Sequence, residues 1–160
     1  MPVPATRRGA AMTAAPAPGA LLARGVCRHL GAHGFACLEE FAPTRGLRVD
    51  VIALGPKGEI WIVECKSSRA DFTADRKWPA YLPWCDRFFF AVDPGFPAEI
   101  LPEGSGLILA DSHDGEIAAM APGRRLAGAR RAALTRRLAH CAMRRLMTCR
   151  GEGARPEVPR

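Results

Sequence analysis

The sequence predicts an α/β protein in which a mixed β-sheet is flanked by helices. Helical and strand-like apolar patterns alternate along the chain in the order α-β-β-β-α-β-β-β-α. One predicted strand follows a helix that itself follows a strand, which indicates a right-handed crossover and a parallel pair. The length of 160 residues, 48% of them hydrophobic, suits one domain that can bury a core.

The first half of the chain predicts a helix and three strands. Residues 21–33 place apolar side chains at helical spacing and end before Gly34, which predicts the first helix. The segments after it are rich in β-branched and apolar residues, with a turn-rich Gly-Pro-Lys-Gly between the second and third. We expect consecutive antiparallel strands at 35–41, 48–54 and 60–66.

The second half predicts two helices and three more strands. Residues 69–82 are charged and amphipathic, with Ser68 or Asp71 as the N-cap and Pro79 near the end, so a surface helix is expected. Asp75 is interpreted as an ion-pair partner on its solvated face. The unbroken apolar run 87–92 is typical of a buried central strand. A hairpin of edge strands and a long helix follow, at 106–110, 116–120 and 126–148.

The two ends of the chain have a different composition. Residues 1–20 contain little besides Ala, Pro and Gly and show no apolar periodicity, so a disordered leader is expected. Residues 149–160 are interpreted as a disordered tail, which leaves 21–148 as the folded domain. No apolar run approaches the roughly 18–20 residues of a membrane span, which excludes a membrane-spanning protein.

The formal charge of +7 is concentrated towards the C-terminus, where residues 121–160 carry eleven basic and two acidic groups. A basic segment of this kind is typical of proteins that bind nucleic acid. The alternative is a solvated face in a protein whose composition is generally rich in arginine.

Charged residues interrupt two of the apolar strands. Asp50 lies in the second strand, and Glu64 and Lys66 lie at the end of the third, where alternation puts both on one face and Cys65 on the other. A five-residue loop, 55–59, would set Asp50 opposite Glu64, whereas a four-residue loop would turn the two carboxylates to opposite faces.

Two carboxylates and a lysine in this arrangement suit phosphodiester hydrolysis with Mg²⁺ or Mn²⁺. Asp50 and Glu64 supply hard oxygen ligands, and the Cys65 carbonyl is a natural third metal ligand. Lys66 can orient or deprotonate the attacking water and stabilise the developing negative charge. We therefore take Asp50, Glu64 and Lys66 as the candidate catalytic residues. From spacing alone, a surface ion pair is the alternative.

This layout, with Asp50 and Glu64-Cys65-Lys66, resembles the PD-(D/E)XK nuclease superfamily. More closely, RVDVIALGPKGEIWIVECKSSRADF (48–72), DRKW (75–78), YLPWCDRFFFAV (81–92) and FPAEILP (96–102) resemble the MmcB family of bacterial DNA-repair proteins. The resemblance implies a restriction-endonuclease-like fold, with Asp50 and Glu64 on the metal and Lys66 on the water. Many superfamily members carry a further Glu on the first helix; residues 21–33 contain no acid, and Glu39 or Glu40 is the nearest candidate.

Two basic segments are candidate DNA-binding residues. Arg76 and Lys77 follow the site in sequence and would hold a phosphate near the scissile bond. Arg130, Arg137 and Arg144 recur every seven residues, so they form one stripe on the C-terminal helix that could follow a phosphate backbone. The chain contains no base-reading motif, so no sequence specificity is expected.

Two hypotheses follow. The first is a DNA-repair enzyme, a Mg²⁺-dependent endonuclease acting on DNA in the bacterial cytoplasm at the nucleoid. The second is a catalytically inactive DNA-binding or adaptor module that works with other repair proteins. The intact Asp, Glu and Lys favour the first hypothesis, and the missing helix acid favours the second.

Overall fold

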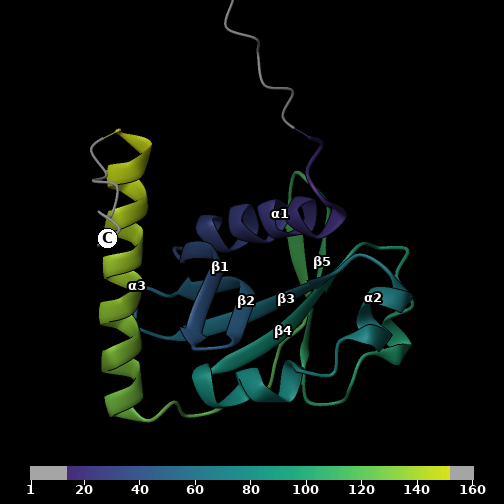
Figure 1. Ribbon diagram of the computed structural model, residues 1–160. Coiled ribbons are helices and arrows are strands. Elements are labelled where there is room, and N and C mark those ends of the chain that lie inside the picture. The colour runs from purple at the N-terminus through teal and green to yellow at the C-terminus, as the bar shows by residue number, and fades with distance from the viewer. Residues whose placement is uncertain (1–13, 152–160) are drawn as a thin grey trace, which may run out of the picture.

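The computed structural model describes residues 14–151 of the chain. Its six strands form one sheet whose spatial order follows the sequence, β1 to β6 (Figure 1). Strands β1 to β3 are antiparallel, β3–β4 and β4–β5 are parallel, and β5–β6 are antiparallel, which confirms the mixed sheet. The strands are β1 (Ala36–Thr44), β2 (Leu47–Leu54), β3 (Ile60–Lys66), β4 (Arg87–Val92), β5 (Gly106–Ala110) and β6 (Gly115–Ala119).

Helices cover both faces of the sheet. Helix α1 (Pro18–Ala32) packs on one face through Leu22, Val26 and Leu30, which are spaced four residues apart and therefore share one side of the helix. The other face is covered by α3 (Gly128–Cys149) and the 3-10 helix η1 (Trp78–Trp84). Helix α3 stands beside the β1 edge of the sheet (Figure 1). Two short elements, α2 (Arg69–Ala74) and η2 (Ala98–Ile100), complete the fold.

Strand alternation divides the core between these two layers. On β2 and β3, Val51 and Val63 point to the α1 face, whereas Ile52 and Ile62 point to the face covered by η1 and α3. All seven residues of β3 are buried, because this strand lies in the middle of the sheet with a layer on each side.

Helix α1 lies very close to the β5–β6 turn. A Cβ atom at Gly25 would press against the backbone carbonyl oxygens of Asp111 and Asp114. The absent side chain at this position therefore allows the helix to reach the sheet.

The ends of the folded part differ slightly from the prediction. Helix α1 begins at Pro18, so its first turn includes residues 18–20, and proline suits this position because the first helical N–H has no partner within the helix. Helix α3 ends at Cys149 and is followed by a turn at 150–151. Residues 14–17 of the predicted leader have no regular secondary structure, and the rest of the predicted leader and tail, residues 1–13 and 152–160, lies outside the described residues.

The helix predicted at 69–82 is wrong beyond Ala74. Helix α2 has the expected cap, because Ser68 Oγ accepts from the Asp71 N–H at 3.1 Å, but it ends at Ala74, and η1 begins at Trp78. Pro79 disfavours helical geometry at Trp78, and Pro83 removes a further donor. The prediction of two edge strands holds for β6 only, since β5 lies between β4 and β6.

Asp86, just before β4, ties the sheet to α3. Its carboxylate accepts from both Nη atoms of Arg131 at 2.6 Å. It also accepts from the N–H groups of Ile60 at 2.8 Å and Leu126 at 3.1 Å.

No helix among the described residues is long and apolar enough to cross a membrane.

Candidate active site

The register of β2 and β3 brings the predicted carboxylates together. Leu54 pairs with Ile60 and Val51 with Val63, so the β2–β3 loop is the five-residue loop 55–59. In this register Asp50 lies opposite Glu64. This confirms the register that the cluster required, and Glu64 follows Ile60 and Ile62 in strand alternation, which puts its side chain on the η1 side of the sheet.

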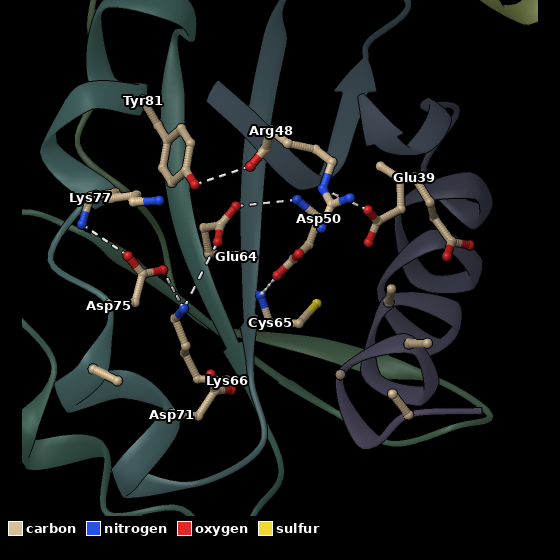
Figure 2. A pocket seen from close by; sticks show the side chains of 16 residues that line it. Glu39, Arg48, Asp50, Glu64, Cys65, Lys66, Asp71, Asp75, Lys77 and Tyr81 are labelled. Atoms are coloured by element: carbon tan, nitrogen blue, oxygen red, sulfur yellow. Dashed lines mark hydrogen bonds and ion pairs between the residues drawn. The ribbon is translucent and has the colours of Figure 1, made fainter. Parts of the chain in front are cut away.

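The two carboxylates lie where the β2–β3 ladder ends. Instead of a backbone pair, the Asp50 N–H donates to Glu64 Oε1 at 3.2 Å. The Cys65 N–H donates to Asp50 Oδ2 at 2.8 Å. Each carboxylate is therefore fixed by a backbone amide of the neighbouring strand. Figure 2 shows the pair between these strands.

The Glu64 carboxylate is buried, and that of Asp50 is half-buried. Glu64 is only 4% exposed. Burial, and next the charge of Asp50, raise the pKa of Glu64 to about 8. Burial also raises the pKa of Asp50, against the hydrogen bond from Cys65. A pair of this kind gains from a cation that neutralises its charge.

Lys66 is held beside the pair by Asp75. Its side chain is 5% exposed, and its Nζ donates to Asp75 Oδ2 at 2.6 Å while lying 3.9 Å from Glu64 Oε2. Burial alone would lower the pKa of Lys66, but the hydrogen bond and charge of Asp75 outweigh it and leave that pKa raised. The same contact lowers the pKa of Asp75 against its own burial.

These residues line a pocket of about 570 Å³ that is rich in carboxylates. Tyr81 lies on its wall, with its hydroxyl donating to the Arg48 carbonyl at 3.0 Å. Arg48 pairs with Glu40 at 2.8 Å. The backbone N–H of Lys77 donates to Asp75 Oδ1 at 2.9 Å, and its side chain borders the pocket (Figure 2).

The α1 side of the pocket carries no acid. The helix contributes Gly19, Ala20 and Ala23 to the lining. Glu39 and Glu40 of β1 are the two candidates for the acid that α1 lacks. Glu40 lies opposite Asp50 in the β1–β2 register and has a left-handed φ of 53°. Glu39 also lines the pocket.

The donor set fits a hard, hydrated cation. Among residues 14–151, no group of three or more His, Cys, Asp or Glu side chains is arranged to hold a metal ion. Mg²⁺ commonly takes only one or two carboxylates and completes its shell with water and phosphate oxygens, which the Asp50–Glu64 pair can satisfy. The Cys65 side chain packs into the α1-facing core, so only its carbonyl could contribute.

The predicted DNA-binding residues do not lie together. Lys77 reaches the pocket lining, whereas Arg76 is exposed and does not. Arg130 donates to the Pro83 carbonyl at 2.8 Å and lies over the Trp84 ring. Arg137 donates to the carbonyls of Ala42 and Pro43, and Arg144 is exposed.

Sequence reasoning missed Asp75 as a site residue. A continuous helix from 69 to 82 would have left Asp75 on a solvated face, whereas the chain turns there and points its carboxylate at Lys66. Pro79 and Pro83 were the available signal. Arg48 and Tyr81 gave no signal, because their contact joins segments 33 residues apart.

A six-stranded mixed sheet flanked by an N-terminal helix and a long C-terminal helix, with a carboxylate pair and a buried lysine on adjacent strands, defines a mixed α/β protein. The family model described as "DNA repair protein MmcB-like" matches residues 7–152, and the chain belongs to this MmcB-like family. A solved structure, a protein of unknown function from Silicibacter pomeroyi, is 60% identical with a TM-score of 0.86, over 89% of this chain and 99% of that one. No curated protein matches.

Proposed function

We propose that this DNA-repair protein is a divalent-metal-dependent phosphodiester hydrolase that acts on DNA without strong sequence specificity. The observation that carries the proposal is the set of contacts among Asp50, Glu64, Lys66 and Asp75 in one pocket, in which Glu64 and Lys66 are buried. Buried carboxylates and a buried ammonium group are costly unless they are paired or functional.

Asp50 and Glu64 would hold Mg²⁺ or Mn²⁺. The Cys65 carbonyl would be a third ligand, since the N–H and C=O of one strand residue face the same neighbouring strand and the Cys65 N–H faces Asp50. Such an ion supplies an activated water and neutralises charge on the phosphate.

Lys66 would act from the other side of Glu64. Asp75 takes one of its three N–H donors, which leaves the others for the attacking water or a phosphate oxygen. The Asp75 contact fixes the ammonium group in a buried position, so Lys66 needs little reordering to stabilise negative charge that develops on the phosphate. Asp75 is thus a positioning residue for Lys66.

The second candidate function is a DNA-binding or adaptor module of a repair complex without hydrolysis. One observation favours it: the α1 residues that line the pocket are Gly19, Ala20 and Ala23, so the helix adds no carboxylate there.

A nicking assay separates the two. Wild-type protein and Glu64→Gln are incubated with Mg²⁺ or Mn²⁺ and single-stranded, branched or damaged DNA, with Glu103→Gln as a control that removes the same charge from an exposed loop. We expect cleavage by the wild type and the control and a loss of about 10²-fold or more in Glu64→Gln. DNA binding by all three without cleavage of any substrate would establish the second function.

A further inference from the structure

A second groove lies next to the active-site pocket, between β1 and α3. It has a volume of about 620 Å³, and Arg136, Arg137, His140 and Arg145 of α3 line one side. Ala42 and Glu40 of β1 line the other side.

The groove is continuous with the active site along the surface. Glu40 borders both hollows. A smaller hollow of about 400 Å³ joins them a second way, because it shares Ala42 with the groove and Arg48, Lys77 and Tyr81 with the active-site pocket. A flexible chain could therefore pass from the active site over β1 to α3 without leaving a concave surface.

The two hollows have opposite charge. Six carboxylates and three cations line the active-site pocket. Three guanidinium groups and one carboxylate, that of Glu40, line the groove, and Arg48 pairs with this carboxylate. An acidic pocket repels phosphate until a cation is bound, whereas the groove attracts it unaided.

Two of the groove's arginines are held rigidly. Arg137 donates to the carbonyls of Ala42 and Pro43, and Arg145 donates to those of Glu39 and Glu40. Because these side chains are ordered before any ligand arrives, their charge can be used with little loss of conformational entropy.

Arg136 and His140 are the groove residues free to contact a ligand. They are four residues apart and so share one face of α3. Both are exposed, and neither side chain makes a hydrogen bond or ion pair within the described part of the chain. Arg130, by contrast, faces η1, so the cationic face that the groove offers differs from the predicted Arg130–Arg137–Arg144 stripe.

We propose that the β1–α3 groove binds phosphates of a single DNA strand that continues into the active-site pocket, with Arg136 and His140 as the contact residues. The path of the strand into the active-site pocket rests on the proposed function; phosphate binding in the groove does not. Contacts to phosphate alone give affinity that depends on salt and not on sequence.

The test is binding of a fluorescein-labelled single strand of about 16 nucleotides, followed by fluorescence anisotropy in EDTA over a series of salt concentrations. We expect Arg136→Ala/His140→Ala to raise the Kd about 5- to 10-fold and to reduce the salt slope by about 0.7 for each phosphate that the variant no longer neutralises. Lys57→Ala removes a cation from the far end of the β2–β3 hairpin and should change the Kd less than about 2-fold.

The groove assignment is overturned if the double variant keeps the wild-type Kd and salt slope, or if Lys57→Ala weakens binding equally. Melting temperatures check that both variants are folded, as expected for exposed positions. Because EDTA removes the metal, the result does not depend on hydrolysis. Loss of binding in the double variant with no cleavage by the wild type would refute the proposed hydrolase and retain the groove.

Discussion

Asp50 and Glu64 hold β2 and β3 together through crossed hydrogen bonds at the point where the ladder between these strands ends. The Asp50 N–H donates to the Glu64 carboxylate, and the Asp50 carboxylate accepts from the residue after Glu64. Each side chain thus takes the place of a backbone acceptor. The pair is positioned by the sheet itself, which is the rigidity that a metal site needs.

The first prediction concerns metal binding by this pair. A saturating excess of Mn²⁺, about tenfold over its Kd, should stabilise the wild type by about 1.4 kcal/mol and raise its melting temperature by about 3–6 °C. Glu64→Gln keeps an acceptor for the Asp50 N–H but loses the charge, so it should show little of this shift. Glu103→Gln is the control; an equal shift in all three proteins would exclude Glu64 as a ligand.

The second prediction concerns Lys66 and Asp75. Because the Lys66 ammonium group is buried and its nearest carboxylate is that of Asp75, each substitution should destabilise the protein. In a double-mutant cycle of Lys66→Met and Asp75→Asn, urea unfolding should give a coupling energy of about 1–3 kcal/mol. Additive effects would mean that this contact contributes nothing to stability.

The third prediction is a pH dependence at Asp86. Burial alone would raise its pKa, but hydrogen bonds from Arg131, Ile60 and Leu126 lower it below the ordinary value of 3.8. Asp86→Asn should reduce the free energy of unfolding by about 2–3 kcal/mol at neutral pH.

A carboxylate with a lowered pKa stabilises the fold fully above its unfolded pKa and loses that contribution as the pH falls through its folded pKa. The difference between wild type and Asp86→Asn should thus be constant above about pH 5 and shrink below about pH 4. Urea unfolding at several pH values measures it, and a difference that persists unchanged in acid would contradict the assignment.

The fourth prediction uses two glycines of α1. Gly25→Ala should destabilise the protein by about 1–3 kcal/mol, because its methyl group meets backbone oxygens of the β5–β6 turn that cannot move aside easily. Gly31→Ala has open space around it and should stabilise by about 0.5–1 kcal/mol through helix propensity. Thermal unfolding of both variants tests this prediction. A change in melting temperature of the same sign in the two variants would contradict it.

Most of the fold could be predicted because apolar periodicity dictates it. The strands at 48–54, 60–66 and 87–92 are buried on both faces or alternate cleanly, and each lies within a residue of its predicted place. The break at Asp75 was missed because charged, amphipathic residues continue past it; only the prolines at 79 and 83 mark the change.

The site was predictable only where it follows strand geometry. Asp50, Glu64 and Lys66 lie on two strands joined by a short loop, so register alone brings them together. Asp75 reaches the pocket from the end of α2 and Tyr81 from η1, and their contacts depend on tertiary packing that no local pattern encodes.

The arginines that α3 places against β1 also affect how the protein behaves towards other chains. Strand β1 is an outer strand, and such strands can template pairing with a neighbouring molecule. Four carbonyls of β1 already accept from Arg137 and Arg145, and the left-handed residue Glu40 interrupts its extended course. The opposite outer strand, β6, is five residues long with an irregular register. Both borders of the sheet are thereby poor templates for strand addition and aggregation.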